Sequence, residues 1–294
     1  MTDQHATPVA DTDAGPTEPP KKAPRAGRNL PAAIAVGVLL GAVIIAILVF
    51  VPRVWVGVVA LAVAIATLEV GRRLREGGFA IPMVPLLVGG QAMIWLTWPF
   101  GAAGALGAYA GTVVVCMIWR LLGHGLTNPP QNYLRDIATT VFLATWVPLF
   151  CSFGALLIYP ADGAGRVFCF MLGVIASDVG GFTAGVLFGK HPMVPAISPK
   201  KSWEGLAGSV VLGIVVSVLA VTFLAGKPAW VGVPLGLMLV ITGTLGDLVE
   251  SQFKRDLGIK DMGTLLPGHG GLMDRLDSLM PSAVATWIVL SLLA

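Results

Sequence analysis

Long apolar runs, broken by Gly, Pro or charged residues, follow one another from about residue 30 to the carboxyl terminus. Each run has about 17 to 25 residues, the length that an α-helix needs to cross a bilayer. The pattern predicts nine transmembrane helices, near 32–51, 54–70, 79–98, 101–122, 136–159, 166–189, 206–225, 229–252 and 277–294. The predicted fold class is therefore an all-α, polytopic integral membrane protein.

The composition supports this class. Of the 294 residues, 55% are hydrophobic and only 12% are charged, whereas soluble domains have about 25% charged residues. Residues 1–29 are rich in Pro, Ala, Thr and Asp and predict a disordered cytoplasmic tail. A formal net charge of +3 is too small to indicate nucleic acid as a partner.

Lysine and arginine are distributed unevenly between alternate connections of the nine predicted helices. If the amino terminus is cytoplasmic, the cytoplasmic side holds all but three of the 19, the exceptions being Arg53, Arg166 and Lys227. Because cytoplasmic loops carry the excess of positive charge, this partition predicts a cytoplasmic amino terminus. We expect about five helices in an amino-terminal region, 30–165, and a catalytic carboxy-terminal region, 166–294.

Two predicted cytoplasmic loops, 190–205 and 250–278, are richer in ionisable groups than a connector requires. At the start of the second loop and just before it, polar residues recur at offsets 0, 3, 4, 7 and 8, which places them on one face of a helix. These residues are Asp247, Glu250, Ser251, Lys254 and Arg255. Since the helix is otherwise apolar, this face must line a water-filled cavity or contact protein.

A second acidic face begins at Asp274, with Asp277 three residues later, after the glycine-rich turn 267–271. Glycines allow a backbone to approach a ligand closely, and their amides can bind phosphate oxygens. Carboxylates on two helices, with basic residues and this turn between them, are typical of a magnesium ion that bridges phosphates. For any single residue, a membrane-surface charge or salt bridge is the alternative interpretation.

Asp178 interrupts the predicted span 166–189, and a lone carboxylate in an apolar helix is usually functional. The alternative is that the neighbouring glycines only pack helices and that Asp178 pairs with a nearby Lys or Arg. The residues leave both interpretations open.

The segment from Ser251 to Asp277, SQFKRDLGIKDMGTLLPGHGGLMDRLD, resembles the full signature of the phosphatidate cytidylyltransferases, also called CDP-diacylglycerol synthases. The segment 195–205, PAISPKKSWEG, and the stretch around Asp178 are also similar to that family. Two positions depart from the family pattern: Phe182 stands where tyrosine is common, and Ser202 where threonine is common.

The resemblance implies an integral enzyme of the cell membrane, usually dimeric, whose active site faces the cytoplasm. Such enzymes join CTP to phosphatidic acid, giving CDP-diacylglycerol and pyrophosphate, and require magnesium; a potassium ion is a further expectation. The family's metal-binding aspartates correspond to Asp247 and Asp274. The predicted catalytic residues are Asp247, Asp274, Lys254, Arg275 and Asp178. The predicted substrate-binding residues are Ser198, Lys200, Lys201, Glu204, Ser251, Arg255, Lys260, Asp261, His269, Gly270, Gly271 and Asp277.

Two other functions compete with this one. A CTP-dependent enzyme could act on another lipid, as a CDP-archaeol synthase or a polyprenol kinase does, although the complete signature argues against both. A transporter could use Asp178 as an intramembrane ion site. Transporters built from repeats should show paired motifs, and residues 30–165 contain nothing that matches Asp178 or the 247–277 array.

Overall fold

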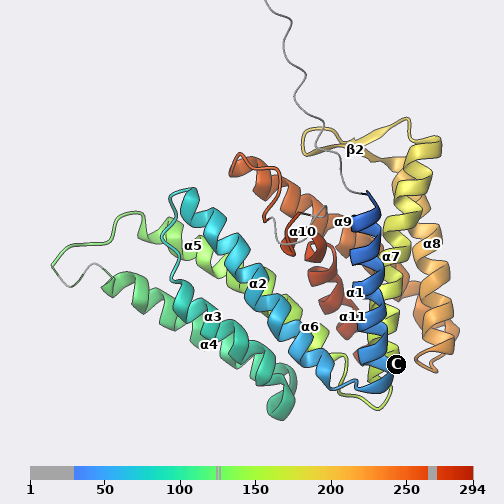
Figure 1. Cartoon of the computed structure of the whole chain (residues 1–294), viewed down its shortest axis with the longest axis horizontal. Helices are drawn as coiled ribbons and strands as arrows, with labels where there is room; N and C mark the ends of the chain where they lie inside the picture. The colour runs from blue at the N-terminus through green and yellow to red at the C-terminus, as the bar shows by residue number, and fades with distance from the viewer. Residues whose placement is uncertain (1–29, 124, 126, 264–269, 294) are drawn as a thin grey trace, which may run out of the picture.

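The chain forms a bundle of α-helices with a short β-hairpin at its end (Figure 1). The computed structural model describes residues 30–123, 125, 127–263 and 270–293, with side chains from residue 37 onward. The first half contains α1 (Leu30–Phe50), α2 (Val54–Glu76), α3 (Met83–Trp95), α4 (Thr97–Leu122), α5 (Tyr133–Ala144), the π-helix η1 (Thr145–Leu149) and α6 (Phe150–Leu156). The second half contains α7 (Gly163–Phe188), β1 (Pro192–Val194), β2 (Ser198–Ser202), α8 (Trp203–Phe223), the 3-10 helix η2 (Ala229–Val231), α9 (Gly232–Asp256), α10 (Met273–Leu276) and α11 (Leu279–Leu292).

A helix lies in each of the nine predicted ranges, but not all of them have the length of a membrane span. Among the described residues, six helical segments are long and apolar enough to cross a bilayer: Val54–Glu76, Thr97–Leu122, Tyr133–Leu156, Gly163–Phe188, Trp203–Phe223 and Ala229–Asp256. The part of α1 whose side chains are described, Gly37–Phe50, and α3 are shorter apolar segments, and α11 has 14 residues. The all-α membrane class is confirmed, whereas nine crossings stay a prediction.

Two helices are interrupted where the sequence supplies a physical cause. Gly101 inside α4 has φ 59° and ψ −144°, a conformation that only glycine adopts readily, and the helix kinks there. Pro148 lies in the π-helix between α5 and α6. Because proline lacks an amide hydrogen, the wider turn accommodates it without ending the segment Tyr133–Leu156.

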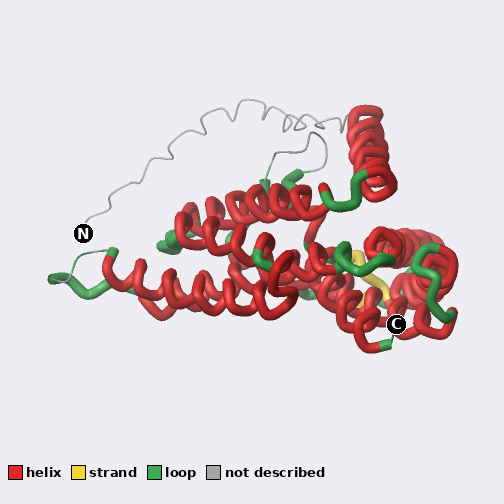
Figure 2. The backbone as a smooth tube through the Cα atoms, turned by 90° about the horizontal axis from the view of Figure 1, so that it is seen from below, coloured by secondary structure: helices red, strands yellow, loops and turns green. Residues whose placement is uncertain are grey.

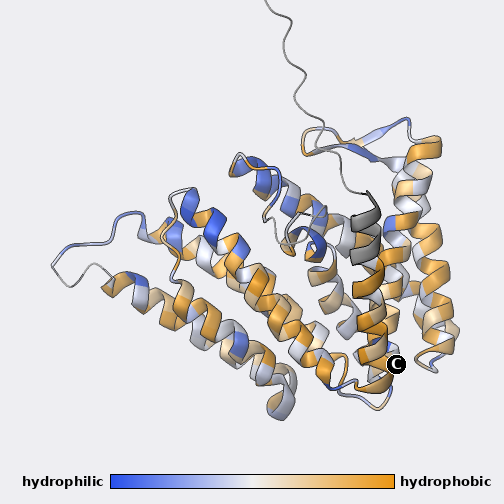
Figure 3. Ribbon diagram, viewed as in Figure 1, coloured by the Kyte–Doolittle hydropathy of each residue, from blue (hydrophilic) through white to orange (hydrophobic). Residues whose placement is uncertain are grey.

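Successive helices run in opposite directions, so their connections gather at two ends of the bundle (Figure 1). The hairpin β1–β2 marks one end, which we call the hairpin end, and hydrophilic residues are concentrated there (Figure 3). Helix α2 reaches the same end, where Arg73 Nε donates to the Met262 carbonyl oxygen at 2.9 Å. Arg135 at the start of α5 donates to the Gly78 carbonyl oxygen just beyond α2.

The opposite end of the bundle, which we call the far end, carries few basic residues. Arg166 lies 2.9 Å from Asp162, and Lys227 lies 3.6 Å from the same carboxylate. Arg53 lies over the Trp98 ring. These are the three basic residues that the charge partition separates from the rest, and in the described part of the chain they lie at the end opposite the hairpin lysines.

The buried core runs between the two halves of the chain and includes Leu143, Val167, Leu235 and Met280, each at most 1% exposed. Helix α1 stands apart from the bundle over most of its length (Figure 2). Its buried contact is near its carboxyl end, where Leu48 is 1% exposed. The compact part of the molecule is therefore formed by the elements from α2 onward.

Helices α7 and α8 pack with their backbones close together. A Cβ on Gly180 would collide with the Gly208 carbonyl group, and one on Gly208 would collide with the side chain of Ala184. The Ser209 hydroxyl donates to the Ser177 carbonyl oxygen at 2.7 Å. Small residues permit such an approach between helices, and it fixes the wall on which the candidate site is built.

Candidate active site

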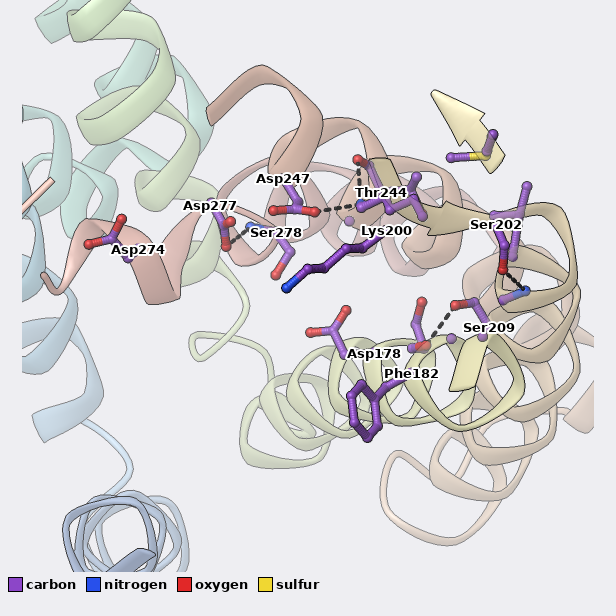
Figure 4. Close-up of a pocket in the computed structure, with 18 of the residues that line it drawn as sticks. Asp178, Phe182, Lys200, Ser202, Ser209, Thr244, Asp247, Asp274, Asp277 and Ser278 are labelled. Carbon is purple, nitrogen blue, oxygen red and sulfur yellow. Dashed lines mark hydrogen bonds and ion pairs between the residues drawn. The ribbon is translucent and has the colours of Figure 1, made fainter. Parts of the chain in front are cut away.

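A pocket of about 440 Å³ opens at the hairpin end. Its walls come from α7, β2, α8, α9 and the α10–α11 turn (Figure 4). Carboxylates and lysines project into it, beside apolar side chains such as Phe182 and Leu206. The pocket thus collects side chains from residue 177 to residue 278, within the region that the sequence designates as catalytic.

Helix α9 supplies an acidic and basic face to this site. Asp247 lines the pocket, and Glu250, one turn further, is 1% exposed. Lys254 follows after another turn, with its Nζ 2.5 Å from Glu250 Oε2. Ser251 is half-buried and Arg255 is exposed, and neither of the two lines the pocket. Asp247, Glu250 and Lys254 therefore follow one another along α9 at the predicted helical spacing, but only Asp247 of the predicted polar face lines the pocket.

Asp274 is held by a set of hydrogen bonds at the start of α10. Lys254 Nζ donates to its Oδ1 at 2.8 Å, and the amides of Met262 and Gly271 donate to its Oδ2 at 3.1 and 2.7 Å. Burial opposes ionisation, but these donors keep the pKa of Asp274 below its usual range. The Gly271 amide, expected to bind phosphate, is engaged by Asp274 in this arrangement.

Three carboxylates converge beside the pocket. Asp247, Glu250 and Asp277 each offer an oxygen within 4.8 Å of the others. Glu250 Oε1 is buried and has no hydrogen-bond partner among the described residues. Burial, together with the negative charge of Asp247, raises the pKa of Asp277. Converging carboxylate oxygens and an unsatisfied buried acceptor fit a hard divalent cation such as magnesium, which takes oxygen ligands.

Asp178 faces this cluster from the opposite wall, inside α7. Figure 4 places its carboxylate across the pocket from Asp247, and the Lys200 side chain points between the two. Ser177 and Gly181 line the same wall. The structure therefore places Asp178 at the pocket, and its catalytic role stays a prediction.

The β-hairpin brings the two lysines of the first predicted loop to the pocket. Strands β1 and β2 pair antiparallel, and Lys200 and Lys201 lie on β2. Lys201 Nζ forms an ion pair with Asp247 Oδ2 at 2.6 Å and donates to the Thr244 carbonyl oxygen at 3.4 Å. Ser198, at the start of β2, is half-buried and does not line the pocket.

The hairpin is fixed to α8 by two polar residues. The Ser202 hydroxyl accepts from the Gly205 amide at 3.1 Å and caps the helix. Glu204 accepts from the amides of Lys190 and His191, each at 3.2 Å, and its other oxygen lies 2.5 Å from His191 Nδ1. Glu204 thus stabilises the base of the hairpin and does not line the pocket.

The remaining predicted residues are distributed around the site. Arg275 lines the pocket. Lys260 and Asp261 are exposed and lie outside the pocket lining. Gly270 has φ 83°, which requires glycine or a strained backbone. His269 lies outside the described residues. Phe182, where the family often has tyrosine, is 75% exposed at the pocket.

Some residues of the site were not among those predicted. Glu250 was visible in the sequence as part of the α9 face, but only the structure groups it with Asp247 and Asp277. Thr244 and Ser209 line the pocket without any sequence signal. Glu69, at the end of a predicted apolar span, accepts a hydrogen bond from the Met273 amide at 2.9 Å. The position of Glu69 in an apolar run was a signal that its carboxylate has a role, but no nearby residue in the sequence indicated that it binds the Met273 amide.

Comparison of the sequence with known proteins identifies relatives that are cytidylyltransferases by name. Residues 31–293 match the sequence model of the Cytidylyltransferase family. The phosphatidate cytidylyltransferase of Mycobacterium bovis is 65% identical over 284 residues, which are 94% of this chain and 93% of that protein. The protein of the same description from Mycobacterium tuberculosis is also 65% identical, over 94% of this chain and 87% of that protein.

The similarity extends beyond these bacteria. A phosphatidate cytidylyltransferase of Staphylococcus haemolyticus is 31% identical over 243 residues, which are 81% of this chain and 92% of that protein. The family match includes all the described helices that line the pocket. The chain that builds this cluster of carboxylates and lysines therefore belongs to the cytidylyltransferase family.

Proposed function

We propose that this chain transfers CMP from CTP to phosphatidic acid, giving CDP-diacylglycerol and pyrophosphate. The 65% identity to phosphatidate cytidylyltransferases over 94% of the chain supports this activity. The observation that carries the proposal is the pocket at the hairpin end, in which carboxylates of α9 and the α10–α11 turn face lysines of β2. A charged pocket at the end of apolar helices suits a charged nucleotide and a membrane lipid together.

The reaction needs no nucleophile from the protein. An oxygen of the phosphatidic acid phosphate attacks the α-phosphorus of CTP and forms the new P–O bond, while the bond from the α-phosphorus to the bridging oxygen breaks. The electron pair of that bond leaves with pyrophosphate. Catalysis then consists of positioning the two phosphates and balancing their negative charge.

Asp247 and Asp274 are the proposed magnesium ligands, and both line the pocket. The convergence of Asp247 with Glu250 and Asp277 adds two carboxylates that can hold the ion or support its ligands. A bound magnesium ion would neutralise charge that develops on the triphosphate. A potassium ion beside it is proposed on the family resemblance alone.

The basic residues have distinct proposed tasks. Lys200 and Arg275 line the pocket and would bind phosphate oxygens of CTP or of the lipid. Lys201 is paired with Asp247, and would turn to phosphate when a metal ion neutralises that carboxylate. Lys254 contacts both Glu250 and Asp274, so it keeps these two carboxylates together. Asp178, across the pocket, would orient the attacking lipid phosphate through Lys200.

The hairpin end is proposed to face the cytoplasm, where CTP is available, in a nine-helix protein of the cell membrane. The concentration of lysine and arginine at that end supports this orientation. A homodimer is proposed from the family resemblance.

The decisive test is the reaction itself. Purified protein is incubated with radiolabelled CTP, phosphatidic acid and magnesium, and CDP-diacylglycerol and pyrophosphate are quantified. We expect equimolar amounts of the two products, formed at least about 100-fold more slowly by an Asp247→Asn variant prepared identically. Failure to form product with phosphatidic acids of varied chain length, together with product from another lipid phosphate, would assign a different lipid acceptor.

A further inference from the structure

Helix α2, far from α9–α11 in the sequence, reaches the back of the active site through Glu69. Its Oε2 accepts from the amide of Met273, the first residue of α10, at 2.9 Å. The next residue, Asp274, lines the pocket. One carboxylate of the first half of the chain thus holds the backbone beside a proposed magnesium ligand.

The same carboxylate explains two glycines of the signature segment. A Cβ on Gly263 would collide with the Glu69 carboxyl group, and one on Gly271 would collide with Glu69 and with the Gly263 backbone. Neither Gly263 nor Gly271 has a positive φ. Gly263 is therefore required because Glu69 approaches its backbone closely, and Gly271 because Glu69 and the Gly263 backbone both do; neither is required for a left-handed conformation.

A second residue of α2 contributes to the same contact. Arg73, one turn after Glu69, donates from Nε to the Met262 carbonyl oxygen at 2.9 Å. The Met262 amide in turn donates to Asp274 Oδ2 at 3.1 Å. Glu69 and Arg73 together hold both backbone segments that surround Asp274, which are those at Met262 and Met273.

Burial makes this contact more than a surface hydrogen bond. Glu69 Oε1 is buried and has no hydrogen-bond partner among the described residues. An apolar residue at position 69 would remove the acceptor of the Met273 amide, and an unpaired buried amide is destabilising. The Glu69 carboxylate thus satisfies the backbone at the start of α10 while it lies against Gly263 and Gly271.

We propose that Glu69 is a positioning residue, which acts through the Met273 amide and through its contacts with Gly263 and Gly271 to hold Asp274 at the pocket. The inference deepens the proposed function, because Asp274 is a ligand of magnesium in that proposal. Glu69 touches neither substrate, and it contributes by setting where the carboxylate of Asp274 points.

The test compares Glu69→Ala, Glu69→Gln and Leu68→Ala in purified enzyme. Leu68 is the exposed neighbour on α2 and serves as the matched control. Two measurements are made: the magnesium dependence of kcat, and the thermal stabilisation of the protein by magnesium, which needs no turnover. Correct insertion is checked by the yield of monodisperse protein.

We expect Glu69→Ala to lower kcat at least about tenfold and to raise the magnesium concentration for half-maximal activity and for half-maximal stabilisation several-fold. Glu69→Gln keeps an acceptor for the Met273 amide and should stay near wild type in both measurements. Leu68→Ala should change neither. A normal magnesium dependence in well-folded Glu69→Ala would overturn the proposal. If wild-type protein makes no CDP-diacylglycerol, the proposed function fails, and the stabilisation measurement still tests Glu69.

A double substitution tests the steric part of the proposal. Gly263→Ala alone should impair magnesium stabilisation, because its Cβ collides with Glu69. In the Glu69→Ala background that collision is absent, so Gly263→Ala should add little further loss. Independent, additive losses would show that Gly263 is required for another reason, and would contradict the proposed contact.

Discussion

Asp247 takes part in two kinds of contact that determine how the site is charged. Its carboxylate forms an ion pair with Lys201, and it also belongs to the cluster with Glu250 and Asp277. Three converging carboxylates repel one another unless cations balance them. In the structure Lys201 pairs with Asp247 and Lys254 with Glu250, and a divalent ion fits the same oxygens.

The first prediction concerns this acidic cluster. Asp247→Asn or Asp274→Asn should lower kcat by at least about 100-fold, because either substitution removes a charged ligand from a site that works by charge neutralisation. Membrane insertion should be unchanged. Asp256→Asn, an exposed carboxylate at the end of the same helix, is the control and should retain activity. Activity within a few-fold of wild type in Asp247→Asn would show that this ligand is wrongly chosen.

The second prediction concerns the two lysines of β2. The double variant Lys200→Gln, Lys201→Gln should insert normally but lose most of its activity, with a raised KM for CTP or phosphatidic acid, since charged hydrogen bonds to phosphate are lost. Arginine at both positions should rescue only in part, because a planar guanidinium does not replace a compact ammonium.

The control for the lysine prediction is Lys190→Gln, an exposed residue that contacts Glu204 through its backbone amide. Steady-state kinetics with each substrate varied separately will identify which phosphate the lysines bind. Wild-type kinetic constants in the double Gln variant would mean that the lysines serve only as positive charges at a membrane surface.

At the scale of elements, the close packing of α7 against α8 sets the shape of the pocket wall. Gly180, Gly208 and the Ser209–Ser177 hydrogen bond hold the two helices together, and Asp178 lies beside this contact. The β-hairpin that carries Lys200 and Lys201 leads directly into α8. A shift of α8 would therefore move both lysines relative to Asp247.

The third prediction tests this packing. Gly208→Val should destabilise the protein by about 1–3 kcal/mol, because overpacking forces the helix backbones apart. It should also lower activity by displacing the hairpin. The matched control is Gly107→Val in α4, where nothing lies within 4 Å of the added Cβ. Thermal unfolding in detergent measures both variants; equal stability of the two would contradict the close approach of α7 and α8.

At the scale of the whole molecule, the distribution of basic residues between the two ends of the bundle predicts which end faces the cytoplasm. The hairpin end gathers Lys200, Lys201 and Arg73, whereas the far end has Arg53, Arg166 and Lys227. The structure also guides where cysteines can be added to test this topology. Met262 in the 250–278 loop is 1% exposed, and a Cβ on Gly163 at the far end would collide with the Ile158 carbonyl group, so neither position suits an added cysteine.

The fourth prediction uses the exposed positions Lys200, Asp256 and Ala161. Cysteines at 200 and 256 should react with an impermeant thiol reagent only from the cytoplasmic side, and a cysteine at 161 only from outside. Cys116, Cys151 and Cys169 are free and buried, so the background labelling should be low. The protein without added cysteines is the control. Labelling of 161 and 256 from the same face would mean that the number of crossings between them is miscounted.

Features that depend on neighbours along the chain could be predicted from the amino-acid sequence alone. Apolar runs are local, so the helical class and the approximate helix ranges could be predicted, although α3 and α11 are shorter than a typical span. The spacing of Asp247, Glu250 and Lys254 follows from the 3.6-residue period of one helix, and the structure places them on one face. The signature from Ser251 to Asp277 sufficed for the family.

Which of these groups come into contact depends on how distant helices pack. Lys201 pairs with Asp247 across 46 positions of sequence, and Glu69 binds the Met273 amide across 204. The tertiary structure also separates Asp247, Asp178 and Lys200, which reach the pocket, from Glu204, Lys260 and Arg255, which do not line it. Such contacts depend on how α2, α7, α8 and α9 pack, and a local pattern of apolar and polar residues does not specify the rotation of one helix against another. The reason for glycine at 263 and 271 likewise became visible only when a carboxylate from the other half of the chain was found against them.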